Sequence, residues 1–208
     1  MNNTRYPPEG HVKLNVDGSS KSDNSTSCGV VRDSEGAFLA GFYLTKKNPQ
    51  NSHLLEIKAF RQGITMVGEL VKLDREECAR FGKVLLFGDA LRTIRSLIKE
   101  NVSRRQKSTT GPLSTETFQL MEDMTEELCF EFDLQFRHDR ENRVADQMCK
   151  DAHLFPDGHK FVDREDELSV KCRRLMKEDN LEPQSTIAIY FVGGYKRGEN
   201  AATEGEAG

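Results

Sequence analysis

The sequence predicts an α/β fold in which a five-stranded mixed sheet is flanked by helices. Three strand-like segments follow one another near the N-terminus and are joined by turns, as in an antiparallel meander. Two later strand-like segments alternate with helical segments, so we expect them to enter the same sheet as crossover strands. Charged residues make up 31% of the chain and hydrophobic residues 36%, a balance that indicates a modest core under a charged surface.

The meander comes first along the chain, and its strands are expected at residues 11–17, 28–33 and 37–45. In the first of them, HVKLNVD, Val12, Leu14 and Val16 share one face, which places Asp17 on the opposite, polar face. The intervening segment GSSKSDNSTS is rich in turn-forming residues, so we expect a loop there.

Helices and crossover strands follow the meander. Apolar residues recur at helical spacing from about 53 to 70, and Asn51 or Ser52 can cap this helix. KVLLFGD, which ends at Asp89, is typical of a buried strand. The remaining expected elements are a short helix at 91–98, a helix at 115–129, a strand at 130–136 and a helix at 142–153.

The chain divides into three predicted parts. Residues 1–10 form a polar arm, residues 11–154 hold the sheet, and residues 155–208 contain a C-terminal helix and a partly disordered tail. The helix is expected at 163–179, where acidic residues come first and basic residues last, as suits a helix dipole. The segment TIAIYFV at 186–192 is either an extra strand or an exposed apolar segment.

Several classes of protein are disfavoured. The N-terminus is polar, and no run of about 18 apolar residues exists, so we expect a cytoplasmic or nuclear protein without membrane contact. The five cysteines lack the paired spacing of a zinc site. The net charge of −4 argues against tight, non-specific binding of nucleic acid, although not against a local basic path.

Four acidic residues lie at the ends of the predicted elements: Asp17, Glu56, Asp89 and Asp146. If the fold gathers them, they cannot all stay ionised without cations, because like charges repel strongly in a buried pocket. Hard divalent cations that prefer oxygen ligands resolve this conflict. The pattern therefore indicates a metal-dependent phosphoryl-transfer enzyme.

The motifs NVDGSS, LLEIKAF, FGDA and RENRVADQM, in this order, resemble the ribonuclease H family. They are especially similar to plant ribonuclease H-like proteins related to the RNase H domains of retrotransposon reverse transcriptases. The resemblance covers residues 11–153. It implies an endonuclease that uses two Mg²⁺ or Mn²⁺ ions to hydrolyse the RNA strand of an RNA–DNA hybrid.

The resemblance also implies a role for each acid. Asp17 would bridge both ions, Glu56 and Asp89 would hold the ion that readies the attacking water, and Asp146 would hold the ion at the leaving 3′ oxygen. His138 occupies the loop where family members often place a histidine that assists proton transfer or product release. Direct contacts to the nucleic acid are expected from residues that flank the acids: Ser19, Asn51 and Arg92.

Two departures from the family pattern keep another function open. The third acid lies in Phe-Gly-Asp-Ala, where the family has small hydroxyl residues beside the aspartate, and the chain has no tryptophan for a basic protrusion. A binding or scaffold protein that has kept the fold and lost turnover is therefore the alternative. A 3′→5′ exonuclease of the same superfamily is disfavoured because Asp-x-Glu is absent at Asp17.

Overall fold

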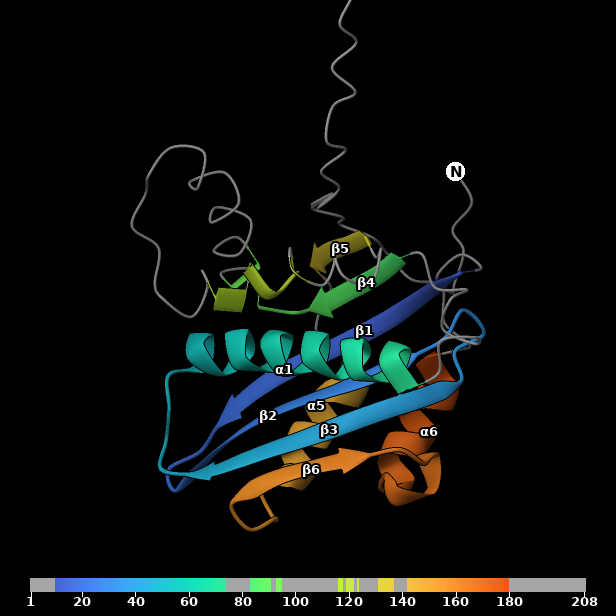
Figure 1. Ribbon diagram of the computed structural model, residues 1–208. Helices are drawn as coiled ribbons and strands as arrows, with labels where there is room; N and C mark the ends of the chain where they lie inside the picture. The colour runs from blue at the N-terminus through green and yellow to red at the C-terminus, as the bar shows by residue number, and fades with distance from the viewer. Residues whose placement is uncertain are drawn as a thin grey trace, which may run out of the picture.

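The computed structural model describes residues 10–73, 83–90, 93–94, 116–117, 119–121, 123, 131–136 and 142–179. Within them the chain forms a sheet of six strands with helices on both faces (Figure 1). The strands are β1 (His11–Ser20), β2 (Asn24–Arg32), β3 (Phe38–Lys47), β4 (Lys83–Gly88), β5 (Glu131–Phe136) and β6 (Gly158–Val162). The helices are α1 (Ser52–Leu73), α5 (Arg143–Ala152), the short 3₁₀ helix η2 (Glu165–Glu167) and α6 (Val170–Asp179).

The predicted five-stranded mixed sheet is confirmed. The strand order is β5-β4-β1-β2-β3-β6, in which β1, β2 and β3 form the antiparallel meander. β4 runs parallel to β1, and β5 runs parallel to β4, as crossover strands do. The predicted helices at 91–98 and 115–129 fall largely outside the described residues, as does the polar arm at 1–10, and the segment from 180 to 208 falls wholly outside them.

The predicted loop between the first two strands is wrong, because most of it is a β-hairpin. β1 continues to Ser20, β2 begins at Asn24, and the Lys21 N–H donates to the Asn24 carbonyl across the turn at 2.8 Å. Ser25, Thr26 and Ser27, which by composition suggested a loop, are buried in β2. The Ser27 hydroxyl donates to the Leu55 carbonyl at 2.9 Å, so tertiary hydrogen bonds satisfy a strand that has polar side chains.

The sixth strand, β6, was not predicted from the sequence. It pairs antiparallel with β3 at the edge of the sheet and lies beyond residue 154, where the sheet was expected to end. Four of its five residues are exposed, and Val162 alone is buried. The strand therefore lacks the alternation of apolar and polar residues that marks a half-buried strand. In the region where a helix was expected at 163–179, the structure has η2 and the shorter α6.

Two apolar layers cover the two faces of the sheet. α1 lies across one face (Figure 1), where Phe60 and Ile64 pack against Leu14 and Val16 of β1. α5 and α6 cover the other face, and Met148 of α5 belongs to their core cluster. Side chains alternate between the two faces along a strand, and those of Leu14 and Val16 point to α1. Asp17 therefore lies on the α5 side of β1. β4, which ends one residue before Asp89, borders β1 directly.

Among the described residues, no helix combines the length and the hydropathy that crossing a bilayer requires.

Candidate metal centre

Gly18 allows β1 to lie directly against the first turns of α1. A Cβ atom at this position would come within 2.7 Å of the Glu56 backbone nitrogen and of the Leu55 carbonyl carbon. These are backbone atoms, which cannot move aside as a flexible side chain could. The close approach places Asp17 of β1 beside Glu56 of α1, and the Gly18 N–H donates to Glu56 Oε1 at 3.2 Å.

This contact makes Gly18→Ala a sharp test of how the site is held together. The added methyl group would push β1 away from α1, so we expect the free energy of unfolding to fall by about 1–3 kcal/mol. Urea unfolding measures the loss. Gly41→Ala is the matched control, because its added Cβ meets nothing closer than 3.2 Å. Equal losses in the two variants would contradict the proposed role of Gly18.

The N-terminus of α1 is held by its own cap and by β2. The Asn51 side-chain oxygen accepts from the His53 N–H at 2.9 Å, so of the two predicted caps, Asn51 and Ser52, it is Asn51 that caps the helix. The hydrogen bond from Ser27 to the Leu55 carbonyl joins the same turn to the sheet. Glu56 is the residue after Leu55, so both contacts fix the position of its backbone.

Asp89 follows the end of β4, next to a second close contact with α1. A Cβ atom on Gly88 would lie 2.8 Å from Cζ of Phe60, whose side chain is fully buried one turn beyond Glu56. The small residue before Asp89 therefore leaves room for the Phe60 ring. This packing gives a structural reason for glycine in the Phe-Gly-Asp-Ala motif, where the family that the sequence resembles has a hydroxyl residue.

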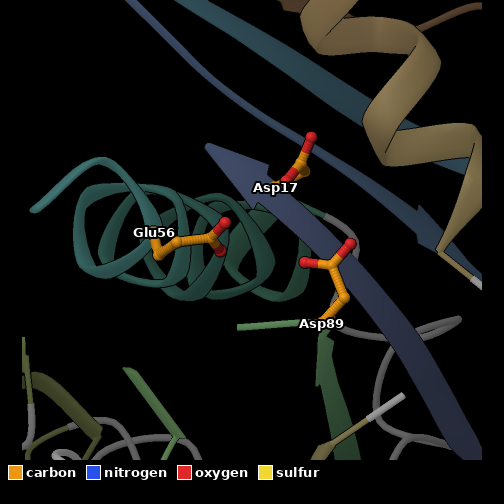
Figure 2. Close-up of side chains that lie close together, drawn as sticks. All are labelled: Asp17, Glu56 and Asp89. Atoms are coloured by element: carbon orange, nitrogen blue, oxygen red, sulfur yellow. The ribbon is translucent and has the colours of Figure 1, made fainter. Parts of the chain in front are cut away.

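The side chains of Asp17, Glu56 and Asp89 come together between β1, α1 and the end of β4. One carboxylate oxygen from each lies within 4.8 Å of the other two. Figure 2 shows Glu56 extending from α1 toward Asp89, with Asp17 projecting from β1 beside them. Asp17 and Glu56 are buried, whereas Asp89 is half-buried. Three acids from distant parts of the sequence thus share one small volume.

Burial and mutual repulsion favour the protonated forms of these acids. Burial, followed by the negative charges of Asp17 and Asp89, raises the pKa of Glu56 to about 10. Burial also raises the pKa of Asp17, and the charge of Asp146 raises it further. Without a cation, Glu56 therefore keeps its proton near neutral pH.

The chemistry of these donors fits a hard divalent cation. All three residues supply carboxylate oxygens, the ligands that Mg²⁺ and Mn²⁺ prefer. Glu56 Oε2 is buried and has no hydrogen-bond partner among the described residues. A buried oxygen without a partner carries a desolvation cost, which a bound cation would offset.

Asp146 lies on α5, on the Asp17 side of the sheet, and is not part of the group of three. It is close enough for its charge to raise the pKa of Asp17. Its side chain is 41% exposed and forms an ion pair with Lys150 one turn further along the helix. The structure thus places Asp146 beside the cluster with a cationic partner of its own.

A buried polar network anchors the N-terminus of α5. Asn142, at the start of the helix, donates through its side-chain amide to the Val16 carbonyl at 2.8 Å and accepts from the Asn15 amide at 3.0 Å. Asn15 in turn accepts from Arg32 at 2.9 Å, and Arg32 pairs with Asp179 of α6. The network connects β1, β2, α5 and α6, and its member Asn15 lies two residues before Asp17. It therefore fixes the position of α5 and of Asp146 on it.

Truncating this anchor gives a second test by mutation. Asn142→Ala leaves the Val16 carbonyl and the Asn15 amide without their partner, so we expect a loss of about 2–4 kcal/mol in the free energy of unfolding. Gln119→Ala, which removes an exposed hydrogen bond from Gln119 to Asp123, is the control. Urea unfolding compares the two variants. A loss below 1 kcal/mol for Asn142→Ala would show that the network does not anchor the helix.

The other predicted site residues have different outcomes. His138 and Arg92 lie outside the described residues. Asn51 uses its side-chain oxygen as a helix cap. Ser19 is half-buried near the end of β1, and its hydroxyl lies 3.1 Å from Nε2 of His153. His153 was not singled out from the sequence, because its contact with Ser19 joins residues 134 positions apart and leaves no spacing signal.

Comparisons with known proteins bear on the fold. No family model matches the sequence, and no curated protein matches it significantly. Among solved structures, LC9-RNase H1, a type 1 RNase H with the type 2 active-site motif, is 12% identical with a TM-score of 0.55 and covers 89% of this chain and 93% of its own. The N-terminal RNase H domain of rv2228c from Mycobacterium tuberculosis is 16% identical with a TM-score of 0.50, covering 68% and 92%.

A third similar structure is LC11-RNase H1 in complex with an RNA/DNA hybrid. It is 13% identical with a TM-score of 0.51 and covers 67% of this chain and 94% of its own. At such low identities the likeness shows the fold alone. The chain therefore has an RNase H-like fold, in which β6 forms one edge of the sheet.

Proposed function

We propose that this protein is a metal-dependent endonuclease that hydrolyses the RNA strand of RNA–DNA hybrids. The observation that carries the proposal is the convergence of Asp17, Glu56 and Asp89 within 4.8 Å on an RNase H-like fold. The structure of LC11-RNase H1 with a bound RNA/DNA hybrid supports the choice of substrate. The four sequence motifs further support a relationship with plant and reverse-transcriptase-type RNase H proteins, and the polar N-terminus is the basis for proposing a cytoplasmic or nuclear location.

Two Mg²⁺ or Mn²⁺ ions are the proposed cofactors. Asp17, Glu56 and Asp89 would hold one of them, and Asp17 together with Asp146 would hold the other. When bound, such ions lower the pKa of water and stabilise charge on the oxygens of an in-line phosphoryl displacement. The high pKa of Glu56 supports the assignment, because a cation replaces the proton that this carboxyl group otherwise keeps.

The carboxylates and the flanking residues have separate tasks in the reaction. Water attacks the phosphorus, the bond to the 3′ oxygen breaks, and the products carry a 5′-phosphate and a 3′-hydroxyl group. Asp17 and Glu56, held by the contact at Gly18, would fix where a cation binds, and only a bound cation would let the scissile phosphate approach these carboxylates. His138 is the proposed carrier of the proton that the leaving oxygen or the departing product needs. Arg92 and Asn51 are the proposed contacts to the nucleic-acid backbone.

Incubation with a labelled hybrid tests this function. We expect cleavage of the RNA strand with Mg²⁺ or Mn²⁺, no cleavage with a chelator, and no cleavage of the DNA strand. Asp89→Asn removes one charge from the cluster without changing its size and should lower the rate about 10²–10³-fold. Wild-type activity no greater than that of Asp89→Asn would reject the proposal.

A binding protein without turnover is the second candidate. The ion pair between Asp146 and Lys150 favours it, since a cation would have to compete with Lys150 for this carboxylate. Hybrid binding that depends on Mg²⁺ but yields no cut RNA would support this candidate. Cleavage that disappears in Asp89→Asn would exclude it.

A further inference from the structure

Three polar side chains form a chain of hydrogen bonds on the α5 side of the sheet. His153, at the C-terminal end of α5, is buried. Its Nε2 atom lies 3.1 Å from the Ser19 hydroxyl, and its Nδ1 atom contacts Oδ1 of Asn24 at the start of β2. The Asn24 amide nitrogen also donates to the His153 backbone carbonyl at 2.9 Å. The imidazole is thus held on both sides.

The direction of each hydrogen bond follows from these contacts. The His153 carbonyl can only accept, so the NH₂ group of Asn24 must face it and Oδ1 must face the ring. Oδ1 can only accept as well, so Nδ1 carries the proton. The ring is neutral near pH 7, because burial and the charge of Lys21 lower the pKa of His153. Nε2 is therefore an acceptor, and the Ser19 hydroxyl donates its hydrogen to it.

This arrangement leaves the Ser19 oxygen as a hydrogen-bond acceptor. Its only hydrogen is directed at His153, and His153 is its partner among the described residues. Ser19 is half-buried, whereas His153 is buried. Ser19 and Asp17 are two residues apart on one strand, so they share a face of β1. The Ser19 hydroxyl oxygen is thus a hydrogen-bond acceptor that lies next to the acidic cluster.

We infer that Ser19 accepts a hydrogen bond from a ribose 2′-hydroxyl group of the bound strand, and that His153 and Asn24 are positioning residues that hold it in this role. The inference rests on the proposed function, because it identifies which group at that site distinguishes RNA from DNA. A 2′-hydroxyl group can donate to such an acceptor, whereas a deoxyribose offers no donor. A phosphate group offers only acceptor oxygens and would not be recognised by Ser19 in this state.

A purely structural role is the competing explanation, since the same contacts join α5 to the β1–β2 hairpin. The two explanations differ in one measurable quantity, the coupling between Ser19 and a single 2′-hydroxyl group. Hybrids that carry one 2′-deoxynucleotide, moved stepwise along the RNA strand, measure it as a double-mutant cycle. We expect wild-type kcat/KM to fall about tenfold at one position, and Ser19→Ala to show no further fall there.

Two histidine variants test the positioning role. His153→Ala should remove the sensitivity at that same position, whereas His153→Gln should recover part of it by offering an acceptor to the Ser19 hydroxyl. Ser20→Ala and His159→Ala, which alter exposed residues on β1 and β6, should keep the wild-type sensitivity. If Ser19→Ala and wild-type respond alike at every substituted position, the inference is overturned.

Binding measurements separate this inference from the proposed cleavage. In Asp89→Asn, the affinity for the hybrid should fall about tenfold on the same deoxy substitution, and Ser19→Ala should abolish that difference. If this coupling is found and the wild-type protein cleaves no hybrid, the role of Ser19 is supported and the endonuclease is rejected. Cleavage without coupling would reject the role of Ser19 alone. Failure to bind any hybrid would overturn both.

Discussion

Replacing Glu56 with glutamine is expected to stabilise the protein in the absence of divalent cations and to abolish its activity. Glutamine keeps the oxygen that accepts from the Gly18 N–H but removes the ionisable group that burial and two neighbouring acids oppose. We expect the free energy of unfolding near pH 7 to rise by about 1–3 kcal/mol. The rate of hybrid cleavage should fall by about 10³-fold, because a cation loses one of its charged ligands.

The effect of Mg²⁺ on thermal unfolding distinguishes Glu56→Gln from the wild type more sharply. Mg²⁺ should raise the midpoint of thermal unfolding of the wild-type protein, since a ligand that binds only the folded state stabilises it. Glu56→Gln should show little or no rise. Glu69→Gln, an exposed position on the same helix, is the control and should behave as wild type. A Glu56→Gln variant that is less stable than wild type and responds equally to Mg²⁺ would contradict this account.

The pH dependence of stability is the second large effect. The pKa of Glu56 is about 10 in the folded protein, against an ordinary value of 4.5. Between these two pH values the folded state binds more protons than the unfolded state, so the free energy of unfolding falls as the pH rises. The slope from this group is at most about 1.4 kcal/mol per pH unit. The raised pKa of Asp17 acts in the same direction.

Urea unfolding at pH 5, 7 and 9 without divalent cations measures this effect. The stability difference between Glu56→Gln and wild type should grow steadily over this range, because only the wild type must take up a proton at residue 56 when it folds, and this costs more as the pH rises. Saturating Mg²⁺ should reduce the difference, since the cation replaces the proton. A stability difference that stays constant from pH 5 to 9 would show that Glu56 is not buried with its acidic neighbours.

The regular periodicity of the sequence was enough to predict the central part of the fold. Val12, Leu14 and Val16 alternate along β1, so the face on which Asp17 lies could be read directly. The helical spacing around Glu56 and the apolar run before Asp89 were equally informative. These signals are local, and each placed one acid at the end of one element. The resemblance then supplied the expectation that the elements meet.

What the sequence did not predict depends on tertiary contacts. Ser25, Thr26 and Ser27 suggest a loop by composition, yet hydrogen bonds to distant carbonyls keep them in a strand. β6 has almost no apolar face, so only its pairing with β3 identifies it. His153 meets Ser19 only because α5 packs across β1. The roles of Gly18 and Gly88 likewise depend on the helix that lies against them.

Crystals of the protein soaked in Mn²⁺ would locate the cation by its anomalous scattering. We predict a peak between the carboxylates of Asp17, Glu56 and Asp89 that is absent in crystals of Glu56→Gln. Carboxylates that stay close together with no peak among them, at a Mn²⁺ concentration that supports hybrid cleavage, would contradict the central claim that these three acids form a metal centre.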